Sequence, residues 1–106
     1  MPELSAEDQK LVTLARATMA RTRAAEGAAV RDLDGRTYAA AAVELEHLRL
    51  TALEVCVAMA VSSGARGLEA LVRLGGQGMP DLGAVHDLGG ADVVVHLGDA
   101  QGQLTS

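Results

Sequence analysis

The sequence predicts a single α/β domain: a three-layer α/β/α sandwich around a mixed sheet, with the element order α-β-β-α-β-α-β. Three observations support this prediction. Residues 5–27 have the apolar periodicity of an amphipathic helix, residues 28–44 contain the turn signal of a β-hairpin, and strand-like and helix-like segments alternate further on. Such alternation predicts right-handed crossovers in the later half. A chain of 106 residues suits one core, so we expect one domain over residues 1–106.

The first helix has a start signal, a stop signal and one apolar face. Ser5 followed three residues later by Asp8 is a capping-box-like start, and Gly27 is typical of a helix end. Helical spacing places four apolar residues on one face: Leu11, Val12, Ala15 and Met19. We expect this face to cover the core.

The hairpin and the second helix follow. Asp34-Gly35 is a strong hairpin turn signal, although the run Ala39–Ala42 has helix propensity and weakens the prediction of a second strand. The stretch from His47 to Gly64 is apolar on every side and ends in Ser62-Ser63-Gly64. It predicts a helix buried between other layers.

The last part of the chain predicts two strands separated by a loop and a short helix. The strands are Leu68–Leu74 and Ala91–Leu97, and the glycine-rich loop between them leads into a helix from about Asp81. Residues 98–106 are polar, and we expect them to form a frayed tail.

Composition excludes several classes of function. The net charge is −5, no Lys or Arg follows Arg73, and Tyr38 is the single aromatic residue, which argues against nucleic-acid binding. No apolar run reaches the ~18 residues needed to cross a bilayer, so we expect no membrane association. The lone Cys56 cannot form an internal disulfide, which favours a cytoplasmic location. A core built from small side chains would gain from burial between subunits.

Residues 27–64 resemble the first half of a small zinc-dependent cytidine deaminase. Two motifs match the hairpin of that family, Gly27-Ala28-Ala29 and Asp34-Gly35-Arg36. Glu44 matches the end of the second hairpin strand, and the segment Ala60–Gly64 matches the end of the buried helix. The similarity extends over roughly residues 5–98. It implies the fold predicted above and an assembly of dimers or tetramers packed around the central helix.

The resemblance also implies a chemistry, and this sequence departs from it. In the family, three Cys or His side chains hold a zinc that activates water, and a glutamate moves the protons. The motifs are His/Cys-x-Glu and Pro-Cys-x-x-Cys. This chain contains neither motif. The family's sugar-binding Asn-x-Glu becomes Ala42-x-Glu44, so Glu44 is the one candidate substrate-binding residue.

The positions that carry the chemistry hold other residues. Alignment from Ser62-Ser63-Gly64 places Thr51 at the first ligand and Leu53 at the glutamate, whereas alignment from the hairpin places Leu53 and Val55 there. In the second motif Pro80 is kept, but Asp81 and Ala84 replace the two cysteines. These side chains do not provide the thiolate and imidazole donors that zinc prefers. We therefore expect no catalytic residues, no metal and no cofactor.

The remaining reactive side chains have structural interpretations. Glu44, Glu46 and His47 are close in sequence, but strand alternation would place His47 opposite the two acids, and we interpret the group as a solvated or subunit-facing loop. Cys56 lies among apolar residues, so we interpret it as a small buried hydrophobe and not as a nucleophile. Glu54 is expected to pair with a cation such as Arg49 or to face a subunit interface.

The glycine-rich turn and the other histidines also carry little functional signal. The turn could cradle an anion at a helix N-terminus, but Asp81 already places a negative charge there, and we expect it to be the helix N-cap. His86 and His96 are isolated in the sequence, and we expect structural or surface roles for both.

Three functions remain. The first is a non-catalytic cytidine deaminase-like protein that acts by self-assembly or by binding another protein. The second is a nucleoside-binding module that retains the pocket and uses Glu44. The third is an enzyme, a cytidine deaminase by family resemblance alone, with relocated chemistry or a site completed by a partner subunit.

Overall fold

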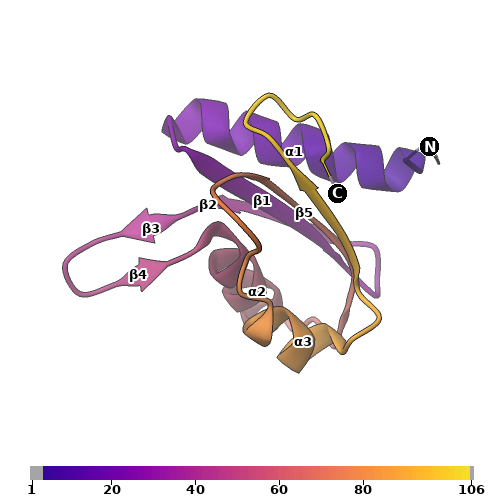
Figure 1. Cartoon of the computed structure of the whole chain (residues 1–106). Helices are drawn as coiled ribbons and strands as arrows, with labels where there is room; N and C mark the ends of the chain where they lie inside the picture. The colour runs from indigo at the N-terminus through magenta and orange to yellow at the C-terminus, as the bar shows by residue number, and fades with distance from the viewer. Residues whose placement is uncertain (1–3, 106) are drawn as a thin grey trace.

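A computed structural model describes residues 4–105 of the chain. The helices and strands follow one another as α1 (Ala6–Thr22), β1 (Glu26–Asp32), β2 (Thr37–Ala41), β3 (Val43–Glu44), β4 (Arg49–Leu50), α2 (Ala52–Ser62), β5 (Leu68–Gly75), α3 (Gly83–Gly89) and β6 (Val94–Gly98). In Figure 1, α1 covers one face of the main sheet and α2 and α3 cover the other. The predicted three-layer α/β/α sandwich is confirmed.

The main sheet is mixed, as predicted. Its strand order is β2-β1-β5-β6, with β1 antiparallel to both neighbours and β5 parallel to β6. Gly35 has a φ of 84° in the β1–β2 turn, the conformation that made Asp34-Gly35 a turn signal. The run Ala39–Ala41 is strand despite its helix propensity, because it pairs residue by residue with Gly27–Ala29.

Helix α1 begins as predicted and ends earlier. The Ser5 side chain accepts a hydrogen bond from the Asp8 amide at 3.0 Å, and Leu11, Val12, Ala15 and Met19 are buried against the sheet. The predicted end at Gly27 is wrong, since the helix closes at Arg23, a left-handed residue with a φ of 55°. Gly27 instead lies in β1, where a Cβ atom would come within 2.4 Å of Met19 Cγ.

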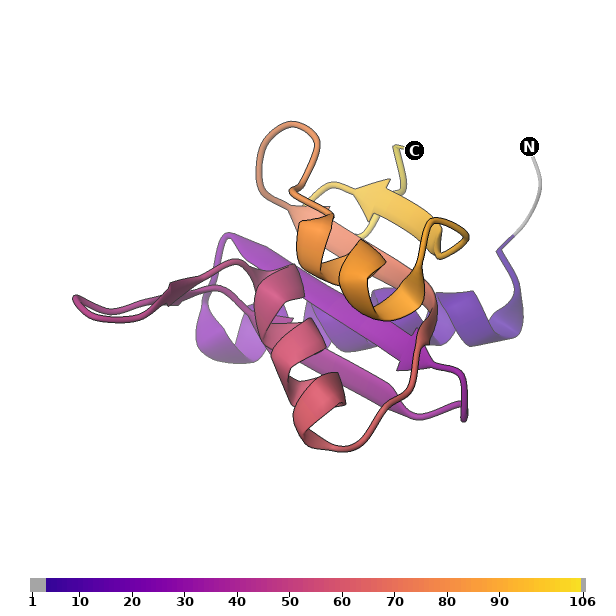
Figure 2. The ribbon, with the colours of Figure 1, turned by 90° about the horizontal axis from the view of Figure 1, so that it is seen from below.

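Helix α2 is not buried on every side, and that prediction is wrong for the single chain. Its inner side holds Ala52, Leu53, Cys56, Val57 and Ala60, all buried. Ala58 and Val61 are exposed, and Val61 is 55% exposed. In Figure 2, α2 lies beside α3 as an outer layer, so the sheet and α3 cover only part of its surface.

Two segments differ from the predicted order. The chain between β2 and α2 forms a small second hairpin, β3–β4, in which Glu44 pairs with Arg49. The prediction of a frayed tail is wrong for residues 98–105. Gly98 forms a bridge with Leu104, the Thr105 amide donates to Leu97 O at 2.7 Å, and Leu104 packs against the α1 side of the core. Residue 106 lies outside the described residues.

The core is divided by the sheet into two clusters. The cluster on the α1 side includes Leu11, Ala29, Val72 and Leu74, and the cluster on the α2 side includes Leu53, Cys56, Leu71 and Val85. Within residues 4–105, no helix has the length and apolar character required to cross a membrane.

Candidate functional site

The first turn of α2 is closed by its own side chains. Thr51 is the N-cap, and its hydroxyl accepts the Glu54 amide at 3.1 Å while Glu54 Oε1 accepts the Thr51 amide at 2.8 Å. This reciprocal pair is a capping box. Glu54 therefore caps its own helix, and among the described residues it forms no ion pair with Arg49. Its place at a subunit interface stays a prediction. Thr51, which the alignment matches to the family's first zinc ligand, therefore uses its hydroxyl to cap α2.

The positions that resemble the catalytic glutamate are apolar in both alignments. Leu53 is 2% exposed and belongs to the core cluster under α2, and Val55 is partly buried against the same cluster. Neither side chain can donate or accept a proton. Leu53 contributes apolar contacts at a position that the alignment from Ser62-Ser63-Gly64 matches to the family's glutamate.

The second motif also lacks ligands. Asp81 is exposed, and its Oδ1 accepts the Gly83 amide at 2.8 Å. The N-cap of α3 is Leu82, so the prediction of Asp81 as N-cap is wrong, although its carboxylate still satisfies an amide at the helix start. Ala84 is partly buried against the core. Neither Asp81 nor Ala84 therefore provides a thiolate or an imidazole.

A buried ion pair that the sequence interpretation missed lies next to the start of α2. Glu26 Oε1 accepts the Ala52 amide at 3.0 Å, and Glu26 Oε2 lies 3.5 Å from Arg73 Nη1. Arg73 Nη2 also donates to the carbonyl oxygen of Gly78. One signal could have revealed this contact. Arg73 is a cation inside an apolar strand, and a buried guanidinium needs a partner.

A pocket of about 580 Å³ lies beside this ion pair. The polar residues that line it are Glu26, Glu44, Arg49, Thr51 and Glu54, and the apolar ones are Leu50 and residues 24–25 and 42–43. The structure thus places Glu44, the predicted substrate-binding residue, on the same pocket as Thr51. The prediction that strand alternation places His47 opposite Glu46 is wrong. Both residues lie in the β3–β4 turn, where both are exposed.

The remaining candidates have structural surroundings. Cys56 is fully buried, and burial raises the pKa of its thiol to about 12, so it stays protonated at neutral pH. Its Sγ donates to the carbonyl oxygen of Tyr38 at 3.6 Å. This agrees with its interpretation as a buried small residue. His86 is exposed.

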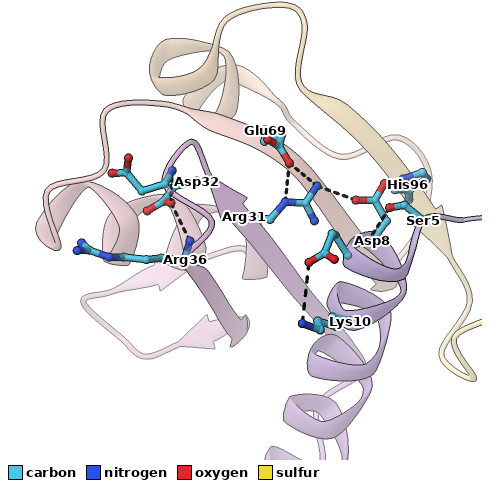
Figure 3. Close-up of polar contacts among 10 residues, drawn as sticks. Ser5, Asp8, Lys10, Arg31, Asp32, Arg36, Glu69 and His96 are labelled. Carbon is cyan, nitrogen blue, oxygen red and sulfur yellow. Dashed lines mark hydrogen bonds and ion pairs between the residues drawn. The ribbon is translucent and has the colours of Figure 1, made fainter.

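His96, which is isolated in the sequence, has a structural role in the fold, as expected. Its Nε2 lies 2.8 Å from Asp8 Oδ2, and Asp8 Oδ1 accepts from Arg31 Nη2 at 2.8 Å. Arg31 Nε also donates to Glu69 at 2.7 Å. Figure 3 shows these four side chains converging between α1 and the sheet. Burial alone would raise the pKa of Asp8, but hydrogen bonds from His96 and Arg31 hold it below its usual value.

Zinc, which the family resemblance implies, does not fit the donors at these positions. A hydroxyl engaged in a cap, a leucine, a carboxylate bound to a backbone amide and an alanine cannot form a tetrahedral nitrogen and thiolate site. Residues 4–105 also contain no group of three His, Cys, Asp or Glu side chains placed to hold a metal ion.

Comparison with known proteins agrees with the fold. The chain has a TM-score of 0.74 to the cytidine deaminase of Burkholderia pseudomallei, at 24% identity over 96% of this chain and 91% of that one. For the cytidine deaminase of Mycobacterium tuberculosis the TM-score is 0.71, at 26% identity over 86% and 85%. For that of Mycobacterium leprae it is 0.69, at 19% identity over 95% and 93%.

Sequence comparison gives two further results. No curated protein matches the chain significantly. The profile of the family described as "Cytidine deaminase-like" matches residues 4–102, which is nearly the whole chain. The chain therefore belongs to the cytidine deaminase-like family.

Proposed function

We propose that this chain is a catalytically inactive member of its family, works without zinc, and acts by self-assembly or by binding another protein. The observation that carries the proposal is that Thr51, Leu53, Asp81 and Ala84 stand where the family has zinc ligands and the catalytic glutamate. Leu53 is the strongest case, because it is 2% exposed within the core. Restoring an acid there would bury a charge without a partner. The single buried Cys56 supports a cytoplasmic setting for this function.

Self-assembly is supported by the outer side of α2. Val55, Ala58, Met59 and Val61 are apolar, and none of them is buried in the single chain. Val61 alone exposes 55% of its surface. Ala58 and Val61 are exposed, and Val55 and Met59 are partly buried against the core. Exposed apolar side chains next to partly buried ones are typical of a protein interface. A second copy of the chain would cover this side and complete the burial that the apolar sequence of α2 predicts.

The test is the oligomeric state of two matched variants. We expect the wild-type protein to be a dimer or tetramer by sedimentation velocity, and Val61→Asp to shift it to monomer. Val94→Asp is the control, because Val94 is similarly exposed (47%) but lies on β6, outside α2. A monomeric wild-type protein would contradict self-assembly and leave a different protein as the partner.

The pocket supports a second candidate, nucleoside binding. Glu44 and Arg49 face each other across the β3–β4 ladder, and both line the pocket of about 580 Å³. That volume lies within the range of small-molecule sites. We expect millimolar cytidine or uridine to raise the Tm in this case, with Glu44→Ala abolishing the shift and Glu46→Ala, outside this pocket, preserving it. Absence of a shift in the wild-type protein would reject this candidate.

A further inference from the structure

An ion pair between Glu26 and Arg73 lies beside the pocket and contacts both the start of α2 and the loop before α3. Glu26 contacts the first amide of α2, at Ala52, and Arg73 reaches the carbonyl oxygen of Gly78 in the loop that precedes α3. The two side chains meet at 3.5 Å, with 21% and 6% of their surfaces exposed. Together they link the start of α2, the beginning of β1, the end of β5 and the loop 76–80.

The glycine-rich loop is shaped to pass over this ion pair. Gly76 has a φ of 69°, and a Cβ atom there would lie 2.1 Å from Arg73 Nη1 and 2.7 Å from Glu26 Oε2. The positive φ favours glycine at this position, and a side chain there would displace the charged ends of Arg73 and Glu26. The glycine at this position is therefore explained by the ion pair beneath it, with no anion ligand required.

We propose that Glu26 and Arg73 form a clasp that fixes the start of α2 against the loop before α3 and so shapes the pocket without a metal. The family resemblance places zinc ligands at the start of α2 and at Asp81 and Ala84, just after the loop that Arg73 contacts, and the residues of this chain at those positions do not fit zinc. The carboxylate of Glu26 also complements the partial positive charge at the α2 N-terminus. The clasp holds the two segments together whether or not the chain self-assembles.

Native-state hydrogen exchange on the full chain tests the clasp. Glu26→Ala removes the acceptor of the Ala52 amide, so we expect that amide to exchange about tenfold faster. The amides of Leu11 and Ala15 in α1 should keep their rates. Glu44→Ala is the control, since it removes another carboxylate from the same pocket and should leave Ala52 unchanged. An unchanged Ala52 rate in Glu26→Ala, or equal acceleration in α1, would overturn the proposal.

A second measurement needs no variant and covers the case in which Glu26→Ala does not fold. In the wild-type protein, the Ala52 amide should exchange more slowly with solvent than it would in an unstructured chain, because it donates to Glu26. The Thr51 amide provides an internal reference, because it donates to Glu54 in an exposed contact. An Ala52 amide that exchanges as fast as in an unstructured chain would reject the clasp.

Discussion

Two buried arginines, Arg31 on β1 and Arg73 on β5, lie on opposite faces of the sheet and show two ways in which this fold accommodates a buried charge. Arg31 is held between Asp8 and Glu69 on the α1 side, where His96 also contacts Asp8. Arg73 is held by Glu26 and Gly78 on the α2 side, next to the pocket. Both obey the rule that a buried charge needs a partner. The first secures a closed layer, whereas the second organises the edge of an open site.

The largest expected effect is at the cluster formed by Asp8, Arg31, Glu69 and His96. Asp8→Asn would leave Arg31 and His96 without their shared carboxylate, and we expect a loss of about 3 kcal/mol in the free energy of unfolding. Urea denaturation provides the measurement. The control is Glu7→Gln, an exposed neighbour whose ion pair with Lys10 spans 3.9 Å and should contribute less than about 0.5 kcal/mol. Equal losses in the two variants would contradict the importance of the cluster.

Acid should destabilise the protein through Asp8 and through a second buried carboxylate outside its cluster, Asp32. Hydrogen bonds hold the pKa of Asp8 below the ordinary value of 3.8 despite burial, and those from Arg36, Tyr38 and Asp34 do the same for Asp32. A lowered folded-state pKa contributes stability that is present above pH 3.8 and is lost as the pH falls through and below that value.

The measurement is the free energy of unfolding as a function of pH. We expect a decline below about pH 4 in the wild-type protein, and a shallower decline in Asp8→Asn, which lacks one of the two groups. Stability that rises on acidification through this window would show that the carboxylates are not ionised and bound as described.

The smallest expected effect is at the start of α2. Thr51→Ala removes the N-cap hydroxyl and should cost about 1 kcal/mol. Thr51→Ser keeps the hydroxyl and serves as the control, with a change of less than about 0.5 kcal/mol in thermal or urea unfolding. If Thr51→Ala were as stable as Thr51→Ser, the cap would not be what this position provides.

The sequence predicted the layers and most of the elements because their signals are local. The Ser5 cap, the Asp34-Gly35 turn and the apolar face of α1 each depend on residues a few positions apart. The end of α1 was misplaced because Gly27 is needed for a close approach to Met19, a contact between two elements. The folded tail was missed for a similar reason, since Leu104 packs against a helix far away in sequence.

The candidate site was only half predictable. Resemblance to a family located the positions of Thr51, Leu53, Asp81 and Ala84, and local chemistry shows why they do not suit zinc. The contacts of Glu26 with Arg73 and of Asp8 with His96 join residues 47 and 88 positions apart. A cation inside an apolar strand indicates that Arg73 needs a partner, but no periodicity or motif in the sequence identifies which residue it is. The folded arrangement identifies the partners in both pairs.

The most direct test of the account is the metal content of the protein purified without added metal, then incubated with zinc and desalted. Inductively coupled plasma mass spectrometry would measure zinc per chain in both samples. We expect far less than one zinc per chain in each sample, and a Tm that a chelator does not change. A stoichiometric zinc that survives desalting would contradict it and return the chain to the class of zinc enzymes.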